Sequence, residues 1–166
     1  MLALVCLPLC APQPQVGTAL LPLPLAPLAL LAMAAVAPAV ASMRKPPLGF
    51  SSWNNVGMEV SAPMLLEVAD AMTSSGLREA GYIYINTDDG WNAPERDAAG
   101  GLQPCSHFTN STMENLTGAL HAKGYKFGIY AAAGFTTCGR RAGSLYNERA
   151  DAKQFKAWGV DCALPL

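Results

Sequence analysis

The stretch "YIYINTDDGW", residues 82–91, ends an apolar, β-branched and aromatic run in two adjacent carboxylates, Asp88 and Asp89. A buried strand does not end in two unpaired charges without a reason, because burying an unpaired charge is costly. Ionised carboxylates can accept hydrogen bonds from hydroxyl groups, bind a cation, or serve as an acid and a nucleophile. These three kinds of chemistry are the hypotheses for this stretch.

Recognition of a sugar fits the aspartate pair best. An acid and a nucleophile in a retaining glycosidase lie about 5–5.5 Å apart across one bond, whereas successive strand residues point to opposite faces. Mg²⁺ and Mn²⁺ favour carboxylates together with phosphate oxygens, and no phosphate-binding loop accompanies the pair. Where the strand frays into a turn, each carboxylate can accept hydroxyl donors, at roughly 1.5–3 kcal/mol per charge-assisted bond. A purely structural alternative is that the side chains of Asp88 and Asp89 cap the following segment. Trp91 is expected to anchor the hydrophobic core rather than to stack on a sugar.

Strand and helix patterns alternate on both sides of this pair. A helix is expected to begin at Ser61 and end at Gly76, and the next to begin with a capping box of Ser111 and Glu114 and end at Gly124. Three strands and a third helix are predicted at 47–53, 81–87, 125–133 and 147–158. Strands separated by helices of this length are parallel and joined by right-handed crossovers.

Two architectures use such units, the closed barrel and the open doubly wound sheet. The open sheet usually has a glycine-rich turn after its first strand, whereas here Ser51-Ser52-Trp53-Asn54 follows. Polar and aromatic residues instead gather at the carboxyl ends of the strands, where a barrel builds its active site: Trp53, Asp88, Asp89 and Tyr130. The predicted fold is α/β, part of a (β/α)8 TIM barrel with three βα units and the start of strand four.

Residues 1–43 form a leader without a single Asp, Glu, Lys or Arg, and residues 44–166 form the one expected domain. The apolar run Leu28–Ala37 precedes Ala39-Val40-Ala41, which has the small-x-small pattern of a signal-peptidase site. Prolines interrupt the leader too often for a stable membrane span. Two glycosylation sequons begin at Asn110 and Asn115. The expected localisation is the secretory pathway, with an extracellular or a lysosome- or vacuole-like destination.

Composition argues against several other classes of protein. The net charge is −1 with interspersed signs, so no nucleic-acid partner is expected. The domain has no C-x-x-C motif and only two histidines, His107 and His121, so a structural zinc site is not expected and no metal ligand is assigned. The three cysteines after the leader are Cys105, Cys138 and Cys162, an odd number that leaves at least one thiol unpaired.

Six blocks in order resemble the α-galactosidases of glycoside hydrolase family 27: "PPLGFSSWNN", "AGYIYINTDDGW", "RDAAGGLQP", "LHAKGYKFGIYAAAG", "TTCGRRAGSL" and "DAKQFKAWGVD". They cover residues 46–161 almost continuously. The resemblance implies a (β/α)8 barrel followed by an antiparallel β domain, and retaining hydrolysis of terminal α-D-galactosides by two aspartates without a cofactor. It implies that Asp88 and Asp89 bind galactose hydroxyls, that Trp53 forms a wall of the pocket, and that Tyr130 and Cys138 line it.

The sequence departs from the family pattern at two places. Met58 and Gly90 occupy positions where family members commonly carry a disulfide bond. The position that the resemblance assigns to the nucleophile holds Leu166, and the position of a sugar-binding lysine holds Leu164. The cysteine that pairs with the counterpart of Cys138 in the family would follow the last residue. No catalytic residue is therefore assigned.

These departures predict a chain truncated before the nucleophile, with recognition groups but little or no hydrolytic activity. The alternatives are a galactose-binding remnant without catalysis and an unrelated barrel enzyme that uses a metal at Asp88 and Asp89. The expected binding partner is an α-galactoside. The chain itself is not expected to form a stable membrane span. Self-association is also expected, because an incomplete barrel leaves open strand edges.

Overall fold

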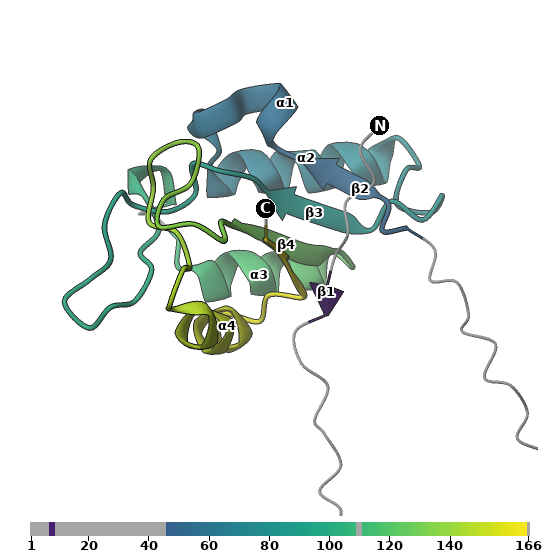
Figure 1. Cartoon of the computed structure of the whole chain (residues 1–166). Helices are drawn as coiled ribbons and strands as arrows, with labels where there is room; N and C mark the ends of the chain where they lie inside the picture. The colour runs from purple at the N-terminus through teal and green to yellow at the C-terminus, as the bar shows by residue number, and fades with distance from the viewer. Residues whose placement is uncertain (1–6, 9–45, 109–110, 166) are drawn as a thin grey trace, which may run out of the picture. The chain divides into compact units, whose positions relative to one another are not determined.

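The computed structural model describes residues 7–8, 46–108 and 111–165 (Figure 1). The chain alternates strands and helices as the sequence predicts. Its main elements are β2 (Gly49–Ser51), α2 (Ala62–Ser74), β3 (Tyr84–Thr87), α3 (Met113–Ala122), β4 (Lys126–Ala131), α4 (Glu148–Ala157) and β5 (Cys162–Pro165). Short elements are β1 (Leu7–Pro8), α1 (Trp53–Val56) and two 3₁₀ turns, η1 (Gly57–Glu59) and η2 (Ser106–Phe108).

The strands form one sheet in the order β1-β5-β4-β3-β2, in which β2, β3, β4 and β5 are parallel (Figure 1). Each parallel neighbour is reached through a helix, so the predicted βα units are confirmed. All four strands therefore end at the same edge of the sheet. That edge is where polar groups after each strand can meet.

Alternate residues of the central strands pack with the helices in one apolar core. Ile85 of β3 and Phe127 and Ile129 of β4 are completely buried, as are Leu65 of α2 and Leu120 of α3. The opposite face carries Asn86, whose side chain fills the space above Gly128, since a Cβ on Gly128 would lie 1.8 Å from Asn86 Oδ1. Close packing on both sides fixes the register of β3 against β4.

The helix ends follow the predicted stop signals with one correction at a helix start. Gly76, Gly124 and Gly159 follow α2, α3 and α4 with positive φ values of 76°, 82° and 78°, which glycine adopts without strain. The N-cap of α3 is Thr112, whose Oγ1 accepts a hydrogen bond from the backbone N–H of Asn115 at 3.1 Å. The predicted capping box beginning at Ser111 is therefore wrong by one residue.

Two features of the leader region and of β5 were not foreseen. Leu7 and Pro8 pair antiparallel with Ala163 and Cys162, and the rest of the predicted leader lies outside the described residues. β5 extends to Pro165, which lies opposite Ala131 although proline offers no N–H to the ladder.

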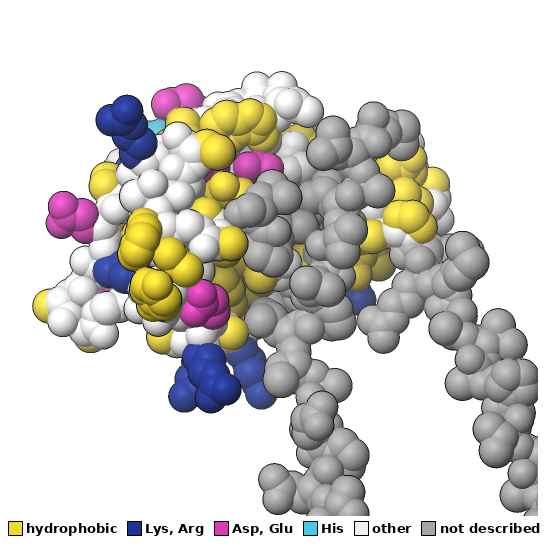
Figure 2. All heavy atoms as spheres, in the orientation of Figure 1, with side chains coloured by type: hydrophobic (Ala, Val, Ile, Leu, Met, Phe, Trp, Pro, Cys, Tyr) yellow, Lys and Arg dark blue, Asp and Glu magenta, His cyan; other side chains and the backbone are white. Residues whose placement is uncertain are grey.

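Acidic and basic side chains are interspersed on the face shown in Figure 2. None of the helices in the described ranges is both long and apolar enough to span a membrane.

Candidate functional site

Asp88 follows β3 directly, and neighbouring groups hold its carboxylate in place. Its Oδ1 accepts the backbone N–H of Asp89 at 2.7 Å, and its Oδ2 accepts the hydroxyl of Ser51 at 3.3 Å. The backbone N–H of Asp88 donates to Ser52 Oγ at 2.9 Å, which ties the end of β3 to the end of β2. The carboxylate is half-buried and still has free lone pairs for further donors.

Asp89 is buried and connects β3 to the loop that follows β4. Only 2% of the residue is exposed. Its Oδ1 accepts the backbone N–H of Gly90 at 2.8 Å, and its Oδ2 accepts the backbone N–H of Gly139 at 2.6 Å. Within the described ranges no ion pair includes Asp88 or Asp89. Backbone N–H groups and the Ser51 hydroxyl, rather than a cation or a helix start, therefore hold the pair.

Met58 fills the space behind this turn. A Cβ on Gly90 would lie 2.8 Å from Met58 Cα, and a Cβ on Gly139 would lie 2.7 Å from Met58 Sδ. Gly90 also has a φ of 97°, a conformation that disfavours a side chain. Met58 and Gly90, the positions at which family members commonly carry a disulfide, thus pack against each other here without a covalent bond.

Tyr130 ends the buried part of β4 and presents a neutral hydroxyl to the site. Burial raises the pKa of Tyr130 to about 12; the negative charges of Asp89, Cys138 and Asp88 act in the same direction, and a hydrogen bond with the Cys138 backbone lowers it. The carbonyl oxygen of Tyr130 accepts the indole N–H of Trp91 at 2.8 Å. The tyrosine is therefore fixed at its backbone and remains a hydrogen-bond donor at neutral pH.

The five residues predicted to bind substrate line one cavity at the carboxyl edge of the sheet, with a volume of about 400 Å³. Trp53 enters it from α1 and is 43% exposed. The described residues that line it are Trp53, Asp88, Asp89, Tyr130, Ala132, Gly134, Thr136 and Cys138. Acceptors, neutral hydroxyl donors and an aromatic surface in one concave space suit a ligand with several hydroxyl groups.

Three lining residues were missed by the sequence reasoning: Ala132, Gly134 and Thr136. Together with Tyr130 and Cys138 they are alternate residues, so one side of the chain continues to face the cavity after β4 ends at Ala131. The period of two along residues 130–138 is the signal that could have found them.

Trp91 lies beneath the site and does not line it. The residue is 1% exposed and makes edge-on contacts with Phe155 and Trp158 of the α4 region, at ring-centre distances of 6.1 and 5.9 Å. The prediction that Trp91 is a core anchor is confirmed.

An ion pair that the sequence did not reveal supports the loops around the site. Both terminal nitrogens of Arg96 donate to the two carboxylate oxygens of Asp151 at 2.7 Å, and they also donate to the carbonyls of Gly100 and Gly143. The hydrogen bond with Asp151 raises the pKa of Arg96, the charges of Asp151 and Asp97 add to this, and burial opposes it. Arg96 thus joins the loop after β3 to α4 and to the loop after β4.

The described residues contain free thiols but no cluster of metal ligands. Among the described residues, no group of three or more His, Cys, Asp or Glu side chains could hold a metal ion. Cys105 and Cys138 are free thiols, Cys105 buried and Cys138 exposed at the cavity. Because Cys138 is unpaired, its side chain is available to line the cavity.

Comparison with known proteins gives consistent matches. A model of the family described as alpha galactosidase A matches residues 52–164. The chain is 44% identical over 117 residues to the alpha-galactosidase of Cyamopsis tetragonoloba, covering 70% of this chain and 28% of that relative. It is 45% identical over 118 residues to alpha-galactosidase A of Cellvibrio japonicus, covering 71% and 29%.

The structure of the alpha-galactosidase from Saccharomyces cerevisiae with raffinose aligns with a TM-score of 0.67 at 36% identity, covering 69% of this chain and 25% of that chain. The chain therefore spans less than a third of the length of each of these proteins.

Proposed function

The chain belongs to the alpha galactosidase A family of glycoside hydrolases, and from this we propose that its cavity binds the terminal galactose of an α-galactoside. The observation that carries the proposal is the convergence of Trp53, Asp88, Asp89, Tyr130 and Cys138 on one cavity. The yeast relative with raffinose supports a galactoside as the ligand class.

The two carboxylates supply the main recognition groups. Asp88 and Asp89 each keep unused lone pairs beyond their bonds to backbone and Ser51, and neighbouring hydroxyls of a pyranose can donate to them. Each such charge-assisted bond contributes roughly 1.5–3 kcal/mol. The hydroxyl of Tyr130 adds a neutral donor, and Trp53 offers an apolar wall for the sugar ring.

The same residues are not arranged for bond cleavage by themselves. Both oxygens of Asp89 already accept backbone N–H groups, so the geometry places this carboxylate as a hydrogen-bond acceptor rather than as a proton donor to a leaving group. The position that the family resemblance assigns to the nucleophile holds Leu166, a residue outside the described ranges. The 166-residue chain is therefore proposed to recognise α-galactosides without hydrolysing them at an enzymatic rate.

A paired measurement on the purified 166-residue chain tests this proposal. Equilibrium dialysis with labelled methyl α-galactoside should show saturable binding, and an aryl α-galactoside should show no turnover above background. Saturable binding with efficient turnover would overturn the claim that hydrolysis is absent. Absence of saturable binding in the dialysis would overturn galactoside recognition itself. Binding that requires an added metal ion would instead favour the metal-using alternative.

Entry into the secretory pathway remains part of the proposal. The charge-free segment 1–43 and the two sequons support it, and Asn115 is exposed in the first turn of α3. Expression in a secretory host should yield glycosylated protein in the medium, or in a lysosome- or vacuole-like compartment. Retention of all the protein in the cytosol would contradict this.

Self-association is proposed for the same chain. Among the described strands, β2 has a neighbour on only one side, so its other edge offers unpaired backbone groups. Size-exclusion chromatography should give an apparent mass that rises with concentration. A monomer at all concentrations would contradict self-association without affecting sugar recognition.

A further inference from the structure

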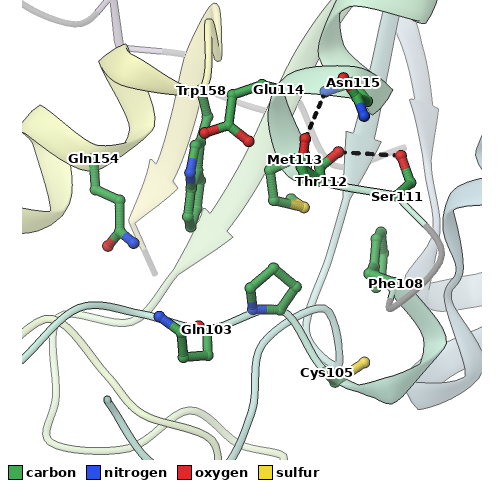
Figure 3. A pocket seen from close by; sticks show the side chains of 11 residues that line it. Gln103, Cys105, Phe108, Ser111, Thr112, Met113, Glu114, Asn115, Gln154 and Trp158 are labelled. Carbon is green, nitrogen blue, oxygen red and sulfur yellow. Dashed lines mark hydrogen bonds between the residues drawn. The ribbon is translucent and has the colours of Figure 1, made fainter. Parts of the chain in front are cut away.

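A second and larger cavity lies away from the proposed galactose cavity. Its volume is about 520 Å³, and it is formed by the start of α3, the end of α4 and the segment 103–108 (Figure 3). The two cavities share no lining residue. Gln154 of α4 fixes the wall of the second one, because its amide donates to the carbonyl of Leu102 at 2.8 Å and accepts the N–H of Leu102 at 3.0 Å.

The lining combines a flat aromatic surface with neutral polar groups and one acid. Trp158 is half-buried, and its indole forms a wall beside Met113 (Figure 3). Among the described residues, no Lys, Arg or His lines the cavity, which argues against phosphate and other anions. Glu114 is the one carboxylate in the described lining, and one carboxylate with neutral oxygens is a poor site for a divalent cation.

The carboxylate of Glu114 is available for a ligand because the helix does not use it. Thr112, not Ser111, caps α3, and Thr112 Oγ1 accepts the N–H of Asn115. Glu114 is exposed, and in Figure 3 its carboxylate lies above the indole of Trp158, at the mouth of the cavity.

We propose that this cavity is a second carbohydrate site, which holds a neutral pyranose against Trp158 while Glu114 accepts its hydroxyls. The apolar face of a sugar ring can pack on the indole, and two adjacent hydroxyls can share one ionised carboxylate. The cavity has room for a ring with a substituent. The choice of a carbohydrate over other neutral ligands rests on the proposed function, whereas the location of the site does not.

The three tryptophans provide separate reporters for the two sites. Trp53 lines the galactose cavity, Trp158 lines the second cavity, and Trp91 is buried between the α4 region and Tyr130. Heteronuclear NMR of the 166-residue chain with isotope-labelled indole groups resolves one N–H signal from each, assigned with single Trp→Phe variants. Titration with galactose and with raffinose should move the Trp53 and Trp158 signals in two independent saturation curves, with a much smaller change at Trp91.

Matched variants distinguish failure of this inference from failure of the proposed function. Glu114→Ala should weaken the sugar affinity reported by Trp158 at least about tenfold, because at least one charge-assisted bond is lost, and leave the Trp53 response unchanged. Asp88→Asn should weaken the Trp53 response and leave the Trp158 response unchanged. Because Glu114 is exposed, its replacement should not disturb folding.

A Trp158 signal that does not respond to either sugar while Trp53 does would overturn the second site alone. A Trp158 signal that moves with tetramethylammonium but not with sugar would overturn the carbohydrate assignment, because an aromatic ring beside a carboxylate also suits an organic cation. Movement of Trp158 that follows the Trp53 curve in wild type and disappears in Asp88→Asn would show an indirect effect and equally overturn the proposal.

Discussion

The backbone N–H of Gly139 donates to Asp89 Oδ2 at 2.6 Å and so joins the end of β3 to the loop that carries Cys138. Asp89 is therefore expected to hold the cavity in shape as well as to bind the ligand. This hydrogen bond therefore fixes the position of the loop after β4 relative to the end of β3, and with it the shape of the cavity.

Replacing Asp89 by Asn should lower the free energy of unfolding by about 1–3 kcal/mol, because the amide places an N–H group toward backbone donors. Urea denaturation measures this change. Asp70→Asn is the matched control, since Asp70 is exposed and pairs only with Lys123 on the outer surface. A stability loss no larger than that of the control would contradict the joining role of Asp89.

The pair of Arg96 and Asp151 should be important for stability although it lies outside the cavity. Asp151 is 2% exposed, and removing it as Asp151→Ala leaves Arg96 without its ion-pair partner and with only the more weakly acting charge of Asp97, which costs up to about 3–5 kcal/mol. Arg96→Lys should lower the free energy of unfolding by less, because lysine retains the positive charge but cannot form the bidentate hydrogen bonds to Asp151. Thermal denaturation of both variants beside Arg149→Lys, an exposed substitution, gives the comparison. Equal melting temperatures for all three would refute this role.

Tyr130 should ionise later than an ordinary tyrosine. Its pKa is raised to about 12 from 10.0, so the folded state holds its proton while the unfolded state loses it. Stability should be unaffected by this group below pH 10 and should fall as the pH rises from about 10 to 12. Ultraviolet titration of phenolate formation should show a late step near pH 12 that is absent in Tyr130→Phe. If the titration curve is unchanged in that variant, the assignment to Tyr130 is wrong.

Gly139→Ala should disturb the site through Met58 and Asp89. The new Cβ would lie 2.7 Å from Met58 Sδ and 2.9 Å from Asp89 Oδ2, so both side chains must move. We expect weaker galactose binding, which Met58→Ala in the same chain should partly restore. Gly118→Ala is the control, since nothing lies within 4 Å of its Cβ, and alanine in α3 should add about 0.5–1 kcal/mol of stability. No rescue by Met58→Ala would show that Met58 is not the obstacle.

Much of the fold could be predicted from local patterns. Apolar strands, glycine stops and the period of the helices give the order of β2 through β5, because burial selects those patterns directly. The N-cap of α3 was misplaced because Ser111 and Thr112 are both good capping residues, and only the packed helix selects between them.

The site was predictable where residues adjoin a strand end, as for Asp88 and Asp89. Arg96 and Asp151 lie 55 residues apart, and no local pattern connects them. Their pairing depends on the way in which the loop after β3 folds back over α4. The Arg96–Asp151 ion pair could therefore be identified only from the three-dimensional structure.

The most direct test of the account is the comparison of galactose with its epimer glucose in equilibrium titrations of the 166-residue chain and its Asp88→Asn variant. The titrations are followed at the indole signal of Trp53, which lines the Asp88 cavity and not the second one. We predict saturable binding of galactose, weaker binding of glucose, and a loss of at least about tenfold in galactose affinity in the variant. Equal affinity for both sugars, or galactose binding that is unchanged by Asp88→Asn, would contradict the claim that this carboxylate recognises galactose.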